Sequence, residues 1–164
     1  MGDRTYSFDV NLQLSDGAAA QTSSGYSQVG GATAQLDLGG NQATGAVNVA
    51  GRIDAMVVIF LIAGTFSTSD VYRFTVCGSN DPAFAAGNVQ NFASIDFGIA
   101  ASRDGLNAMT TAAPLGTGYY PKDSMYELPF TNEQNNVKYE FLQMYVTATT
   151  SIQYTAYVAV LPEP

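Results

Sequence analysis

Turn residues interrupt this sequence about every 8–15 positions, and that spacing constrains the fold more than any other feature. Between the turns lie segments rich in Val, Ile, Thr, Tyr and Phe, in which apolar residues recur at every second position. That period is typical of β-strands, whereas a helix would need apolar residues three and four apart over a longer stretch. The 164 residues also fit the size of one domain. We therefore predict a single all-β domain over residues 1–164.

Individual strands can be placed from the alternation. The clearest is Thr5–Leu14, which Asp16-Gly17 ends with turn chemistry. The other strands are predicted, in chain order, at Gly25–Val29, Gln35–Leu38, Ala46–Val49, Arg52–Ile62, Val71–Cys77, Phe92–Phe97, Ser124–Phe130, Val137–Thr147 and Ile152–Leu161. Roughly eight to ten strands with such spacing predict a two-sheet sandwich, with a jelly roll favoured. We then expect the first strand to pair with one of the last.

Three segments add detail to this fold. Pro129 lacks the N–H that a central strand donates, so its strand is expected at a sheet edge. Gly and Pro punctuate residues 98–123, which we predict to form a long irregular loop. Arg52–Ile62 is apolar on both faces, so each face needs a cover. One face fits the core, and the cover of the other could come from the same chain or from a second subunit. The candidate contact residues are Met56, Val58, Phe60 and Ile62.

The charge and the missing residue types exclude several functions. Fourteen acidic against six basic residues give a net charge of −8, which repels nucleic-acid phosphates and anionic lipid. With one cysteine and no histidine, the chain lacks intrachain disulfides, thiolate or imidazole zinc sites and every Ser–His or Cys–His nucleophile. The apolar run Ala55–Ala63 is far shorter than the ~20 residues of a membrane span. We expect no enzyme activity, cofactor, metal, nucleic-acid partner or membrane partner.

Two groups of polar residues are candidates for a metal site or a catalytic site. Asn80, Asp81, Asn88 and Asp96 flank one loop and offer oxygen ligands for calcium, but their spacing matches no calcium motif, and Asn-Asp-Pro is ordinary turn chemistry. Glu127 and Glu140 lie on strands that we expect to form one hairpin, which would suit a glycosidase pair. Solvated strand faces carry Glu commonly, so the structural interpretation is favoured for both groups.

The aromatic residues and the cysteine complete the candidates. Tyr119 and Tyr120 in the predicted long loop suit contact with a protein or carbohydrate, because a rigid ring buries much area at little entropy cost. The strand tyrosines fit core or cross-strand positions. Cys77, near the end of an apolar strand, is predicted to be a small buried hydrophobe without chemistry.

Several phrases carry a family resemblance. They are Arg4–Val10, Gly30–Asn41, Gly78–Phe84, Leu128–Glu133 and Tyr139–Phe141. Together they resemble the small head-decoration, or cement, proteins of tailed bacteriophages, some of which are jelly rolls. The resemblance implies a jelly roll that self-associates and attaches to the outside of an icosahedral head. It implies no catalytic residues.

The function expected from this resemblance is that of a structural virion protein. Its partner would be the major capsid protein, whose subunit contacts it stabilises on the capsid exterior after synthesis in the host cytoplasm. We expect a homo-oligomer, a dimer before a trimer. The alternative is a carbohydrate-binding β-sandwich, favoured by Tyr, Asn and Asp in loops and weakened by the absence of Trp.

Overall fold

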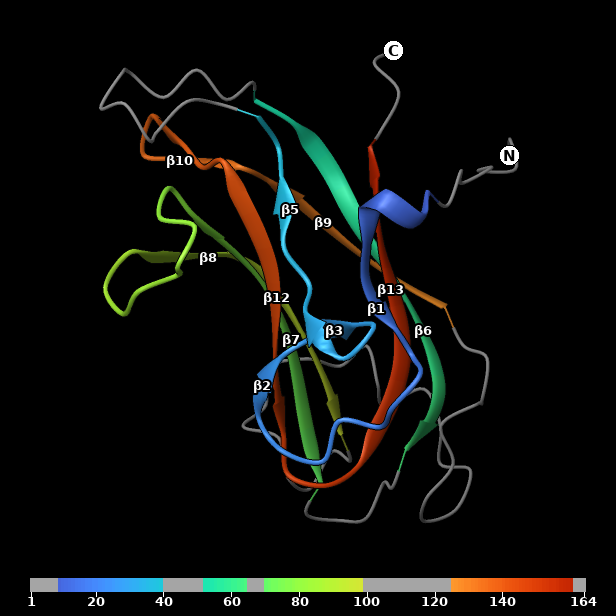
Figure 1. The fold of residues 1–164 in the computed structure, drawn as a ribbon. Coiled ribbons are helices and arrows are strands. Elements are labelled where there is room, and N and C mark those ends of the chain that lie inside the picture. The colour runs from blue at the N-terminus through green and yellow to red at the C-terminus, as the bar shows by residue number, and fades with distance from the viewer. Residues whose placement is uncertain (1–8, 40–51, 65–69, 99–124, 161–164) are drawn as a thin grey trace.

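Two antiparallel sheets make up most of the molecule (Figure 1). They come from a computed structural model, which describes residues 9–39, 52–64, 70–98 and 125–160. Sheet I contains, in spatial order, β1 (Gln13–Asp16), β13 (Ile152–Val160), β6 (Asp54–Gly64) and β9 (Met125–Thr131). Sheet II contains β2 (Gly25–Tyr26), β12 (Phe141–Ala148), β7 (Val71–Ser79) and β8 (Val89–Gly98), and β5 (Leu36–Asp37) also pairs with β12.

Two short hairpins and one helical turn complete the described elements. The hairpins are β3 (Gln28–Val29) with β4 (Ala32–Thr33) and β10 (Glu133–Gln134) with β11 (Val137–Lys138). The single helical element in the described ranges is a 3-10 turn, η1 (Val10–Leu12). No described segment is a helix with the length and apolarity needed to cross a membrane. The predicted all-β, two-sheet fold is confirmed.

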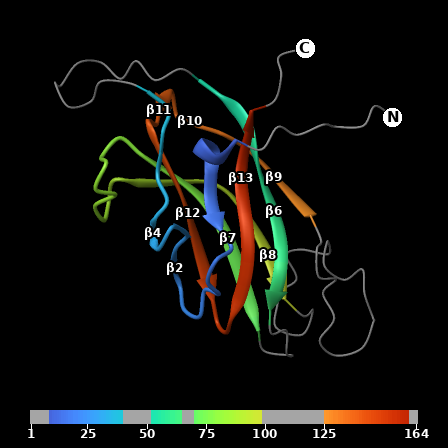
Figure 2. The same cartoon turned by 45° about the vertical axis from the view of Figure 1, so that its right-hand side comes forward.

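Strands far apart in sequence are neighbours in both sheets. The first strand pairs with the last, because Gln13 of β1 faces Tyr157 of β13 and Asp16 faces Thr155. This pairing was predicted and is confirmed. The same nesting continues inward, with β2 beside β12, β6 beside β9, and β7 beside β8. Figure 2 shows β13 and β6 in one layer with β12 and β7 in the other.

The core lies between the two layers. Alternate residues of β6, β7, β12 and β13 point inward and are buried, as the period-2 pattern requires. Phe74 of sheet II meets Tyr154 of sheet I edge to face, with ring centroids 4.8 Å apart. The largest fully buried side chains are Tyr72, Phe74, Leu14, Ile59, Leu142, Met144, Ile152, Val57, Val58, Val76 and Val146. Pro129 lies on β9, which pairs only with β6 in the described part of the chain, so its predicted edge position is confirmed.

The beginning of the predicted first strand is wrong. Val10–Leu12 forms the 3-10 turn, and β1 starts only at Gln13. The Asp9 carboxylate accepts hydrogen bonds from the backbone and side-chain N–H groups of Asn11 at 2.8 and 2.9 Å, while its carbonyl accepts one from Leu12. Such local bonds offer the backbone an alternative to a strand ladder. Residues 5–8 lie outside the described ranges.

The predicted strand Val137–Thr147 is two strands. β11 ends at Lys138, and β12 begins at Phe141 in a different sheet. The break is held by hydrogen bonds from the N–H of Tyr139 to the carbonyl of Asn132 and from the N–H of Glu140 to Oδ1 of Asn80. The predicted strand at residues 46–49 falls outside the described residues, as does the predicted loop 98–123 apart from Gly98, which ends β8.

Candidate functional site

The predicted contact residues of β6 lie on the outer face of sheet I, away from the core. Met56 is 4% exposed and Val58 is fully buried within the single chain, whereas Phe60 and Ile62 are half-buried. A single chain therefore covers Met56 and Val58 without a second subunit. Phe60 and Ile62 leave part of their surface to solvent. The other two candidates, Tyr119 and Tyr120, fall outside the described residues.

Neighbouring strands extend this surface, which we call the outer face of sheet I. Phe60 faces Met125 of β9 on one side and Thr155 of β13 on the other. Met125 is 46% exposed. The outer face of sheet I comprises Gln13, Asp16, Met56, Val58, Phe60, Ile62, Met125, Glu127, Pro129, Thr155, Tyr157 and Ala159. Only two of these twelve side chains, Asp16 and Glu127, carry a charge, so the face suits a partly apolar contact.

The oxygen-rich loop after β7 is held together by Asp81. Its carboxylate accepts hydrogen bonds from the backbone N–H groups of Ala83 and Ala85 and from the side-chain amide of Asn88. The bond from Ala83 is the largest cause of the lowered pKa of Asp81. These bonds make Asp81 the organiser of a turn, as the structural interpretation predicted.

Two other members of this oxygen-rich group, Asn80 and Asp96, have separate partners. Asp96 forms a two-point ion pair with Arg73 on the neighbouring strand, with N–O distances of 2.7 and 2.9 Å. Asn80 bonds instead to the backbone of Lys138 and Glu140. Among the described residues, no group of three acidic or cysteine side chains is placed to hold a metal ion.

The predicted hairpin of Glu127 and Glu140 is wrong. Glu127 belongs to β9 of sheet I, whereas Glu140 directly precedes β12 of sheet II. The β10–β11 hairpin intervenes and carries the chain from one sheet to the other. Glu140 is 4% exposed, and its Oε2 has no hydrogen-bond partner among the residues that the structure describes. The two carboxylates therefore do not share the hairpin from which the glycosidase pair was expected.

Cys77 and the strand tyrosines occupy structural positions, as predicted. Cys77 is buried, and burial raises the pKa of its thiol to about 11. Tyr154 is part of the core, and Tyr145 of β12 meets Tyr26 of β2 edge to face at 5.1 Å. Phe84 completes this aromatic group, with its ring 6.0 Å from that of Tyr26.

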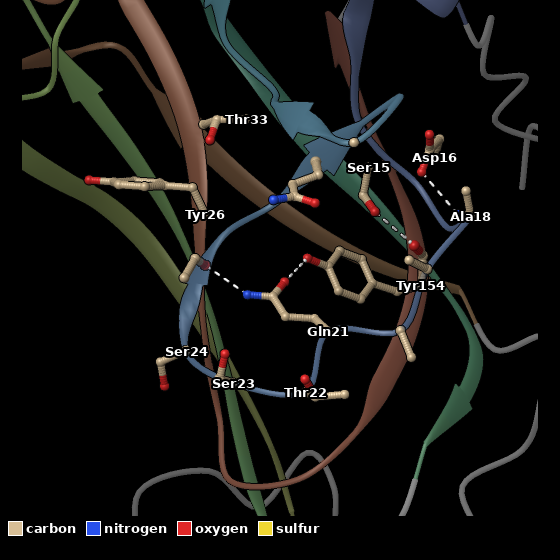
Figure 3. Close-up of a pocket in the computed structure, with 15 residues that line it drawn as sticks. Ser15, Asp16, Ala18, Gln21, Thr22, Ser23, Ser24, Tyr26, Thr33 and Tyr154 are labelled. Carbon is tan, nitrogen blue, oxygen red and sulfur yellow. Dashed lines mark hydrogen bonds between the residues drawn. The ribbon is translucent and has the colours of Figure 1, made fainter.

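A pocket of about 420 Å³ opens where the chain passes from β1 to β2 (Figure 3). One side is the segment 18–24, and another is the β3–β4 hairpin, which lies beside β1. The pocket is lined by Ser15, Asp16, Ala18, Ala19, Ala20, Gln21, Thr22, Ser23, Ser24, Gly25, Tyr26, Gln28, Gly31, Thr33 and Tyr154. Its volume is within the usual range of small-molecule sites.

Hydrogen bonds fix the walls of this pocket. The hydroxyl of Tyr154 donates to Oε1 of Gln21 at 2.7 Å, and Nε2 of Gln21 donates to the carbonyl of Gly25 at 2.8 Å. The Asp16 carboxylate accepts from the N–H groups of Gly30 at 2.7 Å and Ala18 at 2.9 Å. These bonds, the one from Gly30 first, lower the pKa of Asp16, so the carboxylate is ionised at neutral pH.

Sequence reasoning missed this pocket. The run of small and hydroxyl-bearing residues from Ala18 to Ser24 indicated only a connection between strands. A usable signal was present, because Asp16-Gly17 before the run and Gly30-Gly31 after it predict two turns that bring the segment back over β1. The partners of Asp16 and Gln21, however, come from tertiary structure.

Comparison with known proteins assigns no family to the chain. No protein-family model matches it, and a search of curated proteins finds no match.

Proposed function

We propose that this chain is a structural protein of a tailed-phage virion, and that it binds the outer surface of the icosahedral head. There it stabilises contacts between subunits of the major capsid protein. The proposal starts from the resemblance of Arg4–Val10, Gly78–Phe84 and the other phrases quoted above to phage cement proteins. The protein would be made in the host cytoplasm and then join the virion.

The strand order is the observation that carries the proposal. In a jelly roll of eight strands, the first pairs with the eighth, the second with the seventh, the third with the sixth and the fourth with the fifth. The pairs β1–β13, β2–β12, β6–β9 and β7–β8 follow this rule, with β5 as an additional short edge strand. The order supports a jelly roll, which is the fold that the resemblance implies.

The physical basis of such a role is that the binding energies of many symmetric copies add up. A sandwich held by long-range pairing resists deformation, and each copy that bridges two shell subunits adds its binding energy to the shell. A modest contact at each copy is then sufficient. This role needs a binding surface and no catalytic group.

We place the shell contact on the outer face of sheet I. Met125 is 46% exposed there beside half-buried Phe60, and exposed Pro129 continues the surface along β9. When a partner covers an exposed apolar side chain on a sheet face, the burial of apolar surface lowers the free energy of the complex.

A co-sedimentation experiment tests both the function and the face. Purified protein is mixed with phage heads that lack it, and the bound fraction is measured for wild type, Met125→Asp and Val137→Asp. Val137 is a matched control, since it is 41% exposed but lies on the β10–β11 hairpin. We expect Met125→Asp to weaken binding about 30-fold, equivalent to about 2 kcal/mol, with Val137→Asp near wild type.

The two parts of the proposal fail separately. Absence of wild-type co-sedimentation would reject the head-binding function. Binding that Met125→Asp leaves intact, or that Val137→Asp weakens equally, would reject the outer face of sheet I as the contact.

Self-association is the second part of the expected role, with a dimer before a trimer. Because Met56 and Val58 are covered within one chain, these two residues would not form the contact between copies. Light scattering over a range of concentrations measures this, and a monomer mass at every concentration would reject self-association in solution.

A further inference from the structure

The pocket between β1, segment 18–24 and the β3–β4 hairpin has no part in the proposed head contact. Of the residues that line it, only Asp16 belongs to the outer face of sheet I, and β1 is at the opposite edge of that sheet from Met125 of β9. Its opening is accessible, because Ala18, Ala19, Ala20, Thr22, Ser23 and Ser24 are exposed. Its base is rigid, because Gln21 also joins β13 through two backbone hydrogen bonds with Ile152.

The charge of the lining restricts the ligand. Among the described residues that form the pocket, none is Lys or Arg, and Asp16 is the one acidic side chain. The Asp16 carboxylate would repel phosphate, sulfate and carboxylate groups, and the net charge of −8 adds to this repulsion. Anionic ligands are therefore disfavoured.

The polar groups of the lining favour a ligand with many hydroxyls. Four polar side chains make no hydrogen bond within the described part of the chain: Thr22, Ser23, Gln28 and Thr33. Each of them can donate and accept, while Asp16 can only accept. Sugar hydroxyls match both kinds of group, since a hydroxyl donates one hydrogen bond and accepts others.

The lining also contains apolar surface. The methyl groups of Ala18, Ala19 and Ala20 lie among the hydroxyls, and the Tyr154 ring, which is 3% exposed and held by Gln21, forms part of the inner wall (Figure 3). A pyranose ring has the same mixture of polar hydroxyls and apolar C–H groups. A purely apolar ligand would leave the surrounding hydroxyls without partners, at a cost in affinity.

We propose that this pocket binds one ring of a neutral saccharide, with Asp16 accepting from sugar hydroxyls and Thr22, Ser23, Gln28 and Thr33 completing the contacts. The proposal is independent of head binding, because Phe60, Met125 and Pro129, from which the head contact is argued, do not line the pocket.

Nuclear magnetic resonance titration of the isotope-labelled protein tests it. The probes are glucose, galactose, mannose and N-acetylglucosamine, with glucuronate as the anionic counterpart of glucose and glycerol as a control for unspecific hydroxyl contact. We expect saturable amide shifts confined to residues 15–33 and Tyr154 with at least one neutral sugar. Glucuronate is expected to bind at least about tenfold more weakly than that sugar. Glycerol should give no saturable shift.

A pair of variants locates the site. Ser23→Trp places a ring in the opening of the pocket, and Ser94→Trp makes the same change at an exposed position on β8, the opposite edge of sheet II. Ser23→Trp should raise the Kd at least tenfold, while Ser94→Trp leaves it unchanged. Equal thermal melting of both variants and wild type establishes that they fold. The proposal is overturned if no neutral sugar shifts the pocket amides, if glucuronate binds better, or if Ser23→Trp binds as wild type does.

Discussion

Replacing Gly78 by Ala should destabilise the fold strongly, because an aromatic ring lies directly over this glycine. A Cβ added at Gly78 would lie 2.1 Å from Cζ and 2.4 Å from Cε2 of Phe92. Normal contact needs at least 3.4 Å, so the ring would have to move by more than 1 Å. The backbone itself accepts Ala, since Gly78 does not have a positive φ. Most of the cost therefore comes from the side chain of Phe92, with a smaller part from Cβ of Tyr139, which would lie 3.1 Å from the added Cβ.

Phe92 cannot move without losing its other contacts. Its ring is stacked on Phe130 with centroids 6.2 Å apart, and it lies 5.4 Å from the Tyr139 ring. Overpacking typically costs 1–3 kcal/mol, and each disturbed aromatic pair adds about 0.5–1.5 kcal/mol. We expect Gly78→Ala to lower the free energy of unfolding by about 3 kcal/mol. For a domain of this size, that lowers Tm by roughly 6–12 °C.

A double-mutant cycle separates this clash from any other effect. Urea unfolding is measured for wild type, Gly78→Ala, Phe92→Ala and the double variant. In the Phe92→Ala background the added methyl group no longer meets the Phe92 ring, and the contact of 3.1 Å with Cβ of Tyr139 remains. Gly78→Ala should then change the free energy of unfolding by less than about 1 kcal/mol. Equal costs of Gly78→Ala in both backgrounds would refute the reasoning.

Three further predictions concern titratable groups. The folded pKa of Asp16 lies below its ordinary value of 3.8, so the contribution of this carboxylate to stability is complete above that value and is lost as pH falls through the folded pKa. The free energy of unfolding should therefore fall less steeply with decreasing pH in Asp16→Asn than in wild type. An unchanged slope contradicts this. With a thiol pKa of about 11, native Cys77 should react with iodoacetamide at pH 8 at least 100-fold more slowly than in urea, and comparable rates would show that it is accessible. Arg73→Met removes the partly exposed pair with Asp96 and should cost about 0.5–1 kcal/mol in low salt and less in high salt, whereas a cost independent of salt would exclude an ionic contribution.

The sequence predicts those features of this fold that depend on one strand at a time. The all-β class follows from the period of the apolar residues, and the edge position of β9 follows from the missing N–H of Pro129. The pairing of β1 with β13 was also predicted, but from the expected jelly-roll order and not from any single residue.

Features that depend on tertiary partners escaped sequence reasoning. Glu127 and Glu140 were expected in one hairpin, because the alternation from Val137 to Thr147 does not show that the chain changes sheets at Tyr139. That break depends on Asn80, which is remote in sequence. Likewise, the alternation in Val10–Leu12 did not reveal the competing bonds of Asp9.

The candidate sites divide in the same way. The apolar outer face of β6 was recognised from its pattern, but the burial of Met56 and Val58 within one chain was not. The pocket depends on Asp16 reaching Gly30 and on Gln21 reaching Tyr154, two contacts that no sequence pattern specifies. The sequence therefore predicts local chemistry, but it does not predict which distant segments come together.

Electron cryo-microscopy of phage heads incubated with the purified chain tests the central proposal most directly. We predict density for a two-sheet module on the outer surface of the head, bridging neighbouring capsid subunits, with Met125 and Phe60 of sheet I turned toward the shell. Heads that stay bare at saturating protein concentration, or a module that contacts one subunit alone, would contradict the account.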